Sequence, residues 1–588
     1  MKKQLFSGCA IGLSAVLLIG CQGTDNIASE SSIQAPSKPK QQPADEVAAV
    51  LYNQIGYQAN MAKLIYLQAN NALTVDVVDR NNQQSVISKL TSEAQFWPHA
   101  GKNFVELDLT ELSQVGEYQI VIDGEVLASF RVANDVYTRA TKIIAQGFYF
   151  NRASHEISFE YGGKFNRAAG HMDQQVKIHH SAASAHRPEG TVVPSPKGWY
   201  DAGDYNKYTV NSAISMYTML RAYLKHPSFF QQLKLNIPEQ FNSTADILDE
   251  LFWQLDWFLT MQDPNDGGVY HKVTTLNFSG KIMPEAGLEP RYMIAKSIGA
   301  SLDFAATTAY FARHLQDIDA ERAKLCAQAA EQAYKWAKAN PDKIYVQPDD
   351  VKTGAYVVTG DDYSDEWFWA AAELALTFDA KDYWQDLTQL QAIEMSVPTW
   401  SDVQGLGWIS LAEEANAQQW QYKAQQKLKA LAEHMSIMAN QSAIKVSLGV
   451  FDDDFVWGSN GNMANHIMVL DAAKAYVADP ASLNRLIATN LDYIFGTNPT
   501  GYSFVSGLGS QTPMHLHHRV SEADDVLDPV PGLVAGGPHA GQQDQCDYPS
   551  KFPALSYVDD WCSYATNETA INWNAPLLYA VASVASEE

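Results

Sequence analysis

Between residues 47 and 134, apolar and polar positions alternate in short runs. In FVELDL (104–109), Val105, Leu107 and Leu109 fall on one side of an extended chain and the acidic residues between them on the other. The segments KLIYLQA, LTVDVVD and GEYQIVIDG have similar lengths, and glycines bound the last of them. Alternation with a period of two residues is typical of strands that bury one face. We therefore expect a small β-sandwich over residues 47–134.

The pattern changes to a helical period after residue 134. STADILDELFWQLDWFLTMQ (243–262) places Ile247, Leu251 and Leu255 on one face, and its Ser243-x-x-Asp246 start matches a capping box. Comparable stretches recur to the end of the chain, including NSAISMYTMLRAYL, DEWFWAAAELALTF and APLLYAVASVA. Strand-like alternation is scarce in this part. The pattern predicts that residues 135–588 form one large, mainly helical domain with long loops.

The first 21 residues, MKKQLFSGCAIGLSAVLLIGC, have the pattern of an export signal. A positive start precedes an apolar stretch that is too short to span a bilayer. The end, LIGC, resembles a bacterial lipobox, in which Cys21 carries the lipid and becomes the mature N-terminus. We expect a 1–21 signal peptide, an anchor at Cys21 in the cell envelope and, because Gln22 follows, sorting to the outer membrane. The alternative is a plain secretory signal. Residues 22–46, which are polar and bear Pro and Ser, are predicted to be a flexible tether.

The composition of the chain limits the classes of molecule that it is expected to bind. The 588 residues carry a net charge of -26, which argues against nucleic acid or an anionic membrane surface as a partner, since both attract basic patches. We expect a monomer whose contact with a membrane is made through the lipid anchor. The 14 Trp and 28 Tyr residues exceed ordinary usage, and flat aromatic faces are a feature of carbohydrate sites.

The cysteines beyond the export signal fall into two groups. Cys326 lies in a helical pattern and is expected to be a buried small apolar residue. Cys546 and Cys562 share a loop-rich region of an exported chain, which is compatible with a disulfide between them.

Residues 198–210, GWYDAGDYNKYTV, combine two carboxylates with glycines and several aromatic side chains. A solvent-exposed loop does not need that much aromatic area, and an apolar core does not accommodate two ionised acids. A sugar-binding cleft uses both. Taken alone, the Asp201-Ala-Gly-Asp204 sequence is also an ordinary turn or helix cap.

Four spaced motifs make the chain resemble glycoside hydrolase family 9, a cellulase family, in its subgroup with an N-terminal immunoglobulin-like domain. GWYDAGDYNKYTV resembles its Asp-Ala-Gly-Asp motif, and SFVSGLGSQTPMHLHHR (503–519) is similar to its histidine signature. YVDDWCSYATNETAINWNA (557–575) is similar to its C-terminal Asp/Glu signature, and LYNQIGYQ (51–58) to the start of the subgroup's sandwich. The resemblance implies an immunoglobulin-like domain over 47–134 and an (α/α)6 barrel over 135–588.

The resemblance also implies roles for individual residues. Asp204 is the general base, Asp201 helps to hold the attacking water, and Glu568 is the general acid. The remaining catalytic candidates are His517 and Asp559. The substrate-binding candidates are Arg519, Tyr564, Tyr205, His271 and Trp457. Some of these residues have a plainer alternative: Glu568 can favour a helix N-terminus, the His517-His518-Arg519 run can form a metal-binding pair or a solvated basic spot, and Asp559 can be a structural acceptor.

These roles agree with the chemistry of glycoside cleavage by inversion. That reaction needs a protonated carboxyl at the leaving oxygen and an ionised carboxylate about 6.5–9.5 Å away, so that a water fits between them. Glu568 must therefore stay protonated, which an apolar setting would favour; Tyr564, Ile571 and Trp573 lie nearby in the sequence. Two aspartates as close as Asp201 and Asp204 repel each other when both are ionised, so hydrogen-bond donors must stabilise them.

The chemistry requires no cofactor, but a structural metal is a candidate. DDYSDEWFW resembles a family segment that supplies calcium ligands, which makes Asp365 and Glu366 candidates, together with Asp402; oxygen ligands suit calcium. The alternative is that these carboxylates only cap the following helix. Some relatives bind zinc through two Cys and two His ahead of the Asp-Ala-Gly-Asp loop. Here that region, AAGHMDQQVKIHHSAASAHRP, has no cysteine, so we do not predict zinc from the resemblance.

The sequence thus predicts an exported, lipid-anchored enzyme that hydrolyses β-1,4-glucosidic bonds of cellulose, cellodextrins or related β-glucans with inversion. The first alternative keeps the machinery and changes the substrate: an exo-β-glucosaminidase acting on chitosan oligosaccharides. The second is a non-catalytic saccharide-binding lipoprotein.

Overall fold

A computed structural model describes residues 47–588, except 358–361, 452–453 and 587–588. The expected signal peptide, the lipidation site Cys21 and the tether 22–46 lie outside the described residues.

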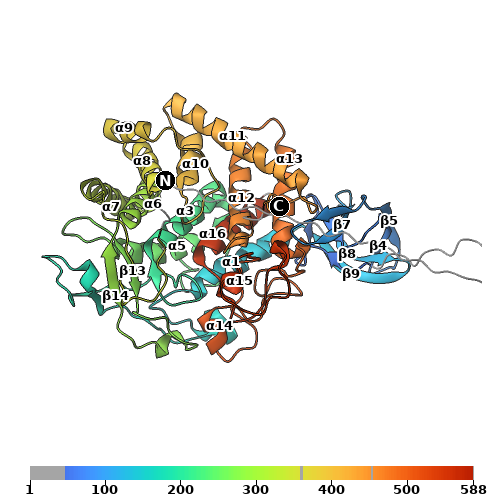
Figure 1. The fold of residues 1–588 in the computed structure, drawn as a ribbon, viewed down its shortest axis with the longest axis horizontal. Helices are drawn as coiled ribbons and strands as arrows, with labels where there is room; N and C mark the ends of the chain where they lie inside the picture. The colour runs from blue at the N-terminus through green and yellow to red at the C-terminus, as the bar shows by residue number, and fades with distance from the viewer. Residues whose placement is uncertain (1–46, 358–361, 452–453, 587–588) are drawn as a thin grey trace, which may run out of the picture. The chain divides into compact units, whose positions relative to one another are not determined.

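The N-terminal part of the described chain consists of two β-sheets (Figure 1). One has the strand order β1-β3-β7-β6 and the other β2-β9-β8-β4-β5. Most neighbours pair antiparallel, while β2 and β9 run parallel. The strands are β1 (Val50–Leu51), β2 (Tyr57–Gln58), β3 (Leu64–Leu67), β4 (Thr74–Asp79), β5 (Ser85–Leu90), β6 (Gln95–Trp97), β7 (Lys102–Asp108), β8 (Gly116–Ile122) and β9 (Glu125–Ala133).

Strand β7 shows why this part folds as it does. Val105, Leu107 and Leu109, the predicted apolar face, are fully buried in a core with residues of both sheets. On the opposite face, Phe104 packs with Trp97 in the core of the helical part. Both faces of this strand are therefore covered, one by the second sheet and one by the helices.

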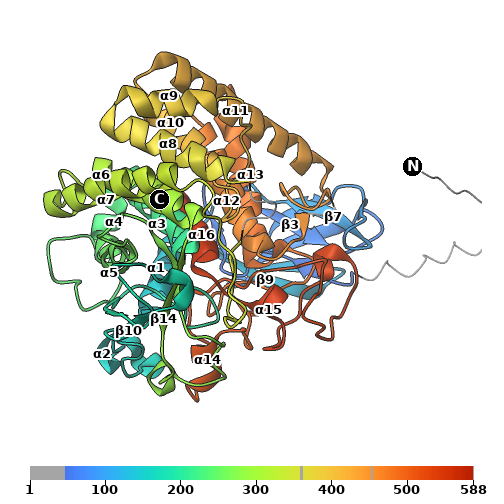
Figure 2. The ribbon, with the colours of Figure 1, turned by 60° about the vertical axis from the view of Figure 1, so that its left-hand side comes forward.

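Helices dominate after Ala133 (Figures 1 and 2). Helix α3 packs against α6, α6 against α8, α8 against α10, α10 against α11, α11 against α12, α12 against α16, and α16 returns to α3. The longer helices are α1 (Val136–Phe150), α3 (Thr209–Lys225), α5 (Asp246–Thr260), α6 (Ile298–His314), α7 (Ala320–Ala339), α8 (Ser364–Phe378), α9 (Lys381–Gln389), α10 (Gln404–Glu414), α11 (Gln418–Gln441), α12 (Ser459–Ala473), α13 (Pro480–Asp492) and α16 (Ile571–Ala585). The short helices are α2 (Phe159–Gly162), α4 (Pro227–Gln232), α14 (Arg519–Ala523) and α15 (Tyr564–Asn567).

The helices differ in how much of their circumference is apolar. Almost every residue of α3, α6 and α16 is buried, as expected for helices enclosed by others. In α7, by contrast, the buried residues recur at helical spacing and are mostly alanines, so one face packs closely on α6. None of the helices within the described residues is long and apolar enough to cross a bilayer.

A third sheet, which the sequence pattern did not reveal, is formed by strands that lie between α2 and α6 in the sequence. Its order is β11-β10-β14-β13-β12, and its strands are β10 (Val176–Ile178), β11 (Val192–Val193), β12 (Lys207–Tyr208), β13 (Tyr270–Thr274) and β14 (Tyr292–Lys296). These strands have two to five residues, too few to show a period. Strand β12 matters for function because it directly follows the Asp201–Asp204 turn and leads into α3.

The capping box expected at Ser243 is wrong. Helix α5 begins at Asp246, and its N-cap is Ala245, which provides no side-chain cap. The carboxylate of Asp246 instead accepts hydrogen bonds from the Leu235 backbone N–H at 2.7 Å and from Lys234 Nζ at 3.0 Å.

The cysteines are arranged as the sequence suggested. Cys546 and Cys562 form a disulfide within the long loop region before α15. Cys326 is a free thiol buried in α7.

Buried polar groups join the sandwich to the helical part. Asn53 Nδ2 donates to Asp492 Oδ1 at 2.7 Å and lies 3.2 Å from the Tyr137 hydroxyl. Trp97 Nε1 donates to the carbonyl of Gly449 at 2.7 Å. Burial raises the pKa of Asp492 to about 8, although hydrogen bonds and Lys63 oppose the rise.

We expect Asp492 to make stability pH-dependent. Because its pKa is higher in the folded protein than in the unfolded chain, the carboxyl favours folding while it is neutral, and this contribution is lost as the pH rises from about 4 towards 8. Asp492→Asn keeps the acceptor for Asn53 without the charge. In urea unfolding, the free energy of unfolding of the variant relative to that of the wild type should therefore increase by at least about 1 kcal/mol between pH 5 and pH 7.5.

The exposed Asp123→Asn serves as the control and should show no such gain. Parallel pH profiles for Asp492→Asn and the wild type would contradict the assignment.

Candidate active site

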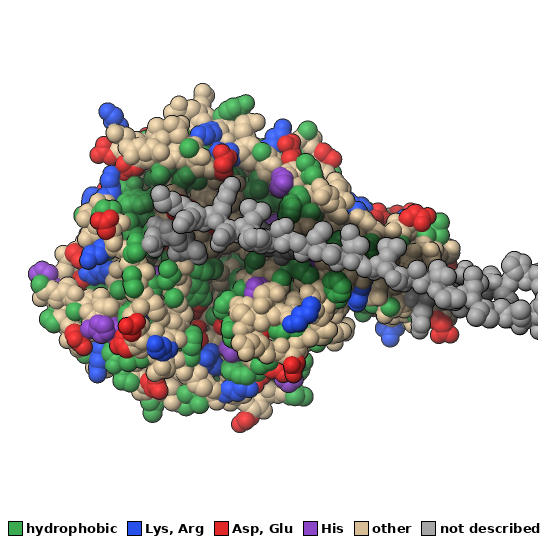
Figure 3. All heavy atoms as spheres, in the orientation of Figure 1, with side chains coloured by type: hydrophobic (Ala, Val, Ile, Leu, Met, Phe, Trp, Pro, Cys, Tyr) green, Lys and Arg blue, Asp and Glu red, His purple; other side chains and the backbone are tan. Residues whose placement is uncertain are grey.

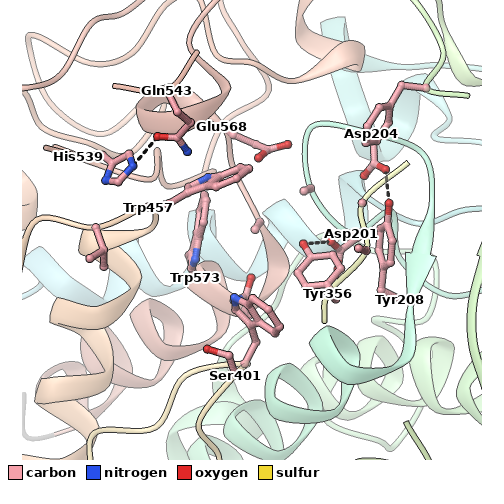
Figure 4. Close-up of a pocket in the computed structure, with 18 residues that line it drawn as sticks. Asp201, Asp204, Tyr208, Tyr356, Ser401, Trp457, His539, Gln543, Glu568 and Trp573 are labelled. Atoms are coloured by element: carbon pink, nitrogen blue, oxygen red, sulfur yellow. Dashed lines mark hydrogen bonds between the residues drawn. The ribbon is translucent and has the colours of Figure 1, made fainter. Parts of the chain in front are cut away.

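The two aspartates of the 201–204 turn and Glu568 line one cavity of about 640 Å³. Figure 4 shows the aspartates on one side of the opening and Glu568 on the other. Aromatic side chains form much of the remaining wall: Tyr208, Phe278, Tyr356, Trp400, Trp457 and Trp573.

Asp201 is fully buried, and both of its carboxylate oxygens are hydrogen-bonded. Asn211 Nδ2, on the first turns of α3, donates to Oδ1 at 2.7 Å, and the Tyr356 hydroxyl donates to Oδ2 at 2.7 Å. Burial and the neighbouring charge of Asp204 raise the pKa of Asp201 to about 8, against the effect of the two hydrogen bonds. At neutral pH the Asp201 carboxyl is therefore largely protonated.

Asp204 has one engaged and one available oxygen. Its Oδ2 accepts from Asn206 Nδ2 at 2.5 Å and from the Tyr208 hydroxyl at 3.0 Å. Its Oδ1 has no hydrogen-bond partner among the described residues, although the residue is almost completely buried. A water molecule on the cavity side would satisfy this oxygen.

Glu568 lies just after α15, where the chain enters α16. Its backbone pairs with His517, and its carbonyl accepts from the Gly536 N–H at 2.8 Å. Burial raises the pKa of its carboxyl well above the usual range; the charges of Asp204 and Asp201 add to the rise, and Arg519 opposes it. The environment thus favours a protonated Glu568 at neutral pH, as the sequence analysis requires.

The 201–204 turn lies against the histidine segment with no room for a side chain at Gly203. A Cβ atom there would lie 1.9 Å from the His517 carbonyl oxygen. The Gly203 carbonyl accepts both the backbone N–H and Nη1 of Arg519, at 3.1 and 2.7 Å. From the other side, the Ile571 N–H donates to the Asp201 carbonyl at 2.8 Å. Three segments far apart in the sequence therefore meet at this turn.

His517 and Asp559 do not line the cavity wall that carries the three acids. His517 stacks on Trp561, and its Nδ1 lies 2.7 Å from the Trp561 carbonyl, which can only accept; Nδ1 therefore carries the proton. Burial lowers the pKa of His517, so the ring is neutral and Nε2 remains an acceptor. Asp559 accepts from the backbone N–H groups of Met514 and His515 at 2.8 and 2.9 Å, which holds the histidine segment.

The substrate-binding candidates separate into two groups. Trp457 lines the cavity, is 45% exposed, and packs beside Tyr564. Arg519, Tyr205 and His271 are buried and outside the cavity wall. Their polar atoms bind the protein itself: Arg519 the Gly203 and Ser279 carbonyls, Tyr205 the Ile282 carbonyl, and His271 Ser297 and the Ala355 carbonyl.

Several cavity residues were not among the sequence candidates. Tyr356 and Trp400 come from loops before α8 and α10 that carry no motif, so the sequence offered no signal for them. Trp573 follows Glu568 in the C-terminal motif. It fits because α12 begins with glycines: a Cβ at Gly461 would lie 2.3 Å from the Trp573 ring.

A second group of acids lies where α6, α8 and the turn before α10 meet. Asp303 is fully buried, and neither of its carboxylate oxygens has a hydrogen-bond partner among the described residues. Burial and the charge of Asp365 raise its pKa well above the usual range. Glu366 is buried with Oε2 unpartnered, while Asp365 accepts from the Val403 N–H at 2.8 Å. Burial raises the pKa of Asp402, and the charge of the nearby Asp365 adds to the rise.

Comparison with known proteins agrees with this site. The model of Glycosyl hydrolase family 9 matches residues 137–581, and that of the Cellulase N-terminal ig-like domain matches residues 45–126. The chain therefore belongs to glycoside hydrolase family 9, in the form that carries an N-terminal immunoglobulin-like domain. It is a glycoside hydrolase with a β-rich N-terminal domain and a helical domain that bears the acids.

Two relatives and a solved structure illustrate the similarity. The chain is 36% identical over 557 residues to a xyloglucan-specific endo-β-1,4-glucanase of Bacteroides ovatus, covering 91% of this chain and 93% of the relative. It is 30% identical over 569 residues to a cellodextrinase of Butyrivibrio fibrisolvens, covering 91% and 99%. A solved family 9 structure from Bacteroides ovatus superposes with a TM-score of 0.85 at 35% identity, covering 92% and 99%.

We expect Gly203→Ala to displace the 201–204 turn. Its Cβ would overlap the His517 carbonyl, and such overpacking costs about 1–3 kcal/mol and moves the backbone. Hydrolytic kcat/KM should fall at least about tenfold, since small misplacements of catalytic groups are costly. Gly280→Ala is the matched control, because a Cβ there meets open space. Equal activity of the two variants would show that the contact does not position the acids.

Proposed function

We propose that this enzyme hydrolyses β-1,4-linked glucans or their oligosaccharides with inversion of the anomeric centre. One observation carries the proposal: the paired aspartates and a glutamic acid with a raised pKa lie on opposite sides of one aromatic cavity. The relatives named above are β-glucan hydrolases, which supports a β-glucan as the substrate.

The reaction follows from the protonation states. Asp204, with Oδ1 available, takes a proton from a water, and Asp201 helps to hold that water. The water oxygen attacks the anomeric carbon while Glu568 gives its proton to the departing glycosidic oxygen. Glu568 ends as the anion and Asp204 as the acid, and exchange of one proton with solvent restores both. Because the water attacks the face opposite the leaving group, a β-linkage yields an α-product.

The aromatic wall suits neutral sugars. Trp400, Trp457 and Trp573 present flat apolar faces, on which the C–H face of a pyranose ring can pack. His539 Nε2 and Gln543 Oε1, 2.6 Å apart at the rim, add polar groups for sugar hydroxyls. Acidic and basic side chains are interspersed over the described part of the face in Figure 3, without the basic area that a nucleic acid would require.

The architecture and location belong to the same proposal. The circuit of contacts from α3 through α6, α8, α10, α11 and α12 to α16 supports an (α/α)6 barrel, in which α3, α6, α8, α10, α12 and α16 are the inner helices. We further propose export and anchoring through Cys21 and action as a monomer. The Cys546–Cys562 disulfide supports an oxidising compartment.

A structural calcium ion is the remaining part of the proposal. Asp303 and Glu366 have three buried carboxylate oxygens without partners, and carboxylates in this state are costly unless a cation balances them. Asp365, Glu366 and Asp303 would supply oxygen ligands, with Asp402 at the edge. Bound there, Ca²⁺ would join α6, α8 and the turn that carries Trp400.

Removing either catalytic proton carrier should abolish turnover without unfolding the protein. Glu568→Gln and Asp204→Asn should each lower kcat on cellopentaose by about 10²–10⁴-fold, the usual worth of general acid or base catalysis. Proton NMR of the wild-type reaction should show the α-anomer first. The exposed Glu125→Gln and Asp123→Asn are isosteric controls and should keep full activity.

The same assay, applied to xyloglucan and chitosan oligosaccharides, tests which class of substrate the enzyme cleaves. A β-anomer as first product, or retained turnover in either active-site variant, would overturn the mechanism. Cleavage restricted to chitosan oligosaccharides would replace the glucan by a glucosamine polymer, and binding without product release would indicate a saccharide-binding protein.

Calcium should stabilise the fold through the acidic group. The midpoint of thermal unfolding should fall when a chelator is added and recover with Ca²⁺, because a ligand that binds only the folded state stabilises it. In Asp303→Asn this response should largely disappear, whereas Asp123→Asn should respond as the wild type does. A wild-type midpoint insensitive to both chelator and Ca²⁺ would contradict the site.

A further inference from the structure

The loop between α7 and α8 carries Tyr356, whose hydroxyl donates to Asp201 across 155 residues of sequence. Figure 4 shows Tyr356 and Tyr208 beside each other, with one hydroxyl on each aspartate, and their ring centroids lie 4.6 Å apart. The backbone of Tyr356 has a φ of 47°, which is uncommon for a residue other than glycine. Such a conformation persists where the surrounding structure imposes it. Contacts elsewhere in the loop therefore hold Tyr356 in its place.

Strand β13 provides these contacts, first through Lys272. The side chain of Lys272 is fully buried. Its Nζ donates to three acceptors of the loop: Gln347 Oε1 at 3.1 Å, Thr353 Oγ1 at 3.2 Å and the Gly354 carbonyl at 2.5 Å. All three acceptors are neutral. A buried ammonium group is costly unless its N–H groups find partners, and here there is one acceptor for each of the three.

His271 binds the next residue of the loop. Its Nε2 lies 2.8 Å from the Ala355 carbonyl, which can only accept, so Nε2 carries the proton. Nδ1, 3.0 Å from the Ser297 hydroxyl, is then the acceptor. Burial lowers the pKa of His271 to about 3, so the ring is neutral at neutral pH. The two carbonyls that directly precede Tyr356 are thus bound by two consecutive residues of β13.

We propose that Lys272 is a positioning residue for the base side of the active site: together with His271, it fixes the loop so that the Tyr356 hydroxyl meets Asp201. Lys272 does not belong to the cavity wall and acts through Tyr356. This role rests on the proposed function, because the place of Asp201 matters only if its carboxyl helps to hold the attacking water. His271, which the sequence predicted to bind substrate, has the same supporting role.

A double-mutant cycle with Lys272→Met and Tyr356→Phe tests the proposal. Burial lowers the pKa of Lys272 to about 7, although the charge of Asp204 opposes this, so the assay is run at pH 6, where the lysine is charged. On cellopentaose, Lys272→Met should lower kcat at least about tenfold and change KM less than about threefold, because the orientation of the attacking water is used in the transition state.

In the Tyr356→Phe background, Lys272→Met should lower kcat less than about twofold, since the hydroxyl that the lysine positions is already gone. Equal losses in both backgrounds would overturn the proposal. They would indicate that the charge of Lys272 acts on Asp204 directly, because that effect does not need the Tyr356 hydroxyl.

Lys63→Met is the matched control. Lys63 is also fully buried, and its Nζ donates to the carbonyls of Ala59 and Met61 at 2.9 and 2.7 Å, but it lies in the sandwich. This variant should lose stability, as Lys272→Met does, and keep the kcat and KM of the wild type. An equal loss of kcat in the two variants would show that burying an altered side chain, and not the position of the loop, causes the effect.

Hydrogen exchange provides a measurement that needs no substrate. Mass spectrometry of the peptides over 345–357 should show faster amide exchange in Lys272→Met than in the wild type or Lys63→Met, because the loop has lost its contacts with β13. Gln347→Met removes one acceptor from the loop and leaves the lysine in place. It should change exchange and kcat in the same direction by a smaller factor, and it keeps the test open if Lys272→Met does not fold.

Unchanged exchange in both loop variants would overturn the positioning role even if the enzyme inverts as proposed. Conversely, if the wild type cleaved no β-glucan, the proposed function would fail, whereas faster exchange in Lys272→Met would still support the contact between β13 and the loop.

Discussion

The active site depends on a backbone contact that leaves no room for a side chain. Gly203 lies so close to the His517 carbonyl that a methyl group would overlap it. The Gly203 carbonyl is at the same time held by two N–H groups of Arg519. This contact holds the 201–204 turn against the histidine segment, and the hydrogen bond from the Ile571 N–H to the Asp201 carbonyl holds it against the start of α16.

Neutral donors, rather than cations, stabilise the buried aspartates. Asn211 and Tyr356 bind Asp201, and Asn206 and Tyr208 bind Asp204. A direct salt bridge would neutralise the pair and lower the pKa of nearby acids. No cation within the described residues forms a direct salt bridge with either aspartate, and their negative charge helps to keep Glu568 protonated across the cavity. The same charge that suits a base on one wall thus prepares the acid on the other.

The sequence predicted the β-rich and helical parts and, within the cavity, the three acids and Trp457, but not most of the other lining residues. Strand alternation at Val105–Leu109 and the apolar spacing in 243–262 were sufficient, because burial there follows a regular period. The third sheet was missed because its strands are too short for a period. The motifs located Asp201, Asp204 and Glu568, because the proposed reaction requires carboxyl side chains at these positions.

The sequence also did not predict in which direction the side chains of the candidate residues point. Arg519 and Tyr205 belong to motif segments, yet they and His271 point into the protein, and no local pattern distinguishes a residue that lines a cavity from one that supports its wall. Tyr356 and Trp400 reach their partners only through tertiary contacts over long sequence separations. Such contacts have no local signature.

One glutamine of the N-terminal sandwich contacts the segment that carries the catalytic histidine candidate. Gln54 Oε1 accepts the backbone N–H groups of Ser510 and Gln511, and its Nε2 donates to the Gly501 carbonyl at 2.7 Å. These residues open the segment that leads to His517. The sandwich therefore cannot be exchanged for another domain without loss. Replacing it would remove the hydrogen bonds that hold this loop and would expose the apolar surface around Gly449 that Trp97 covers.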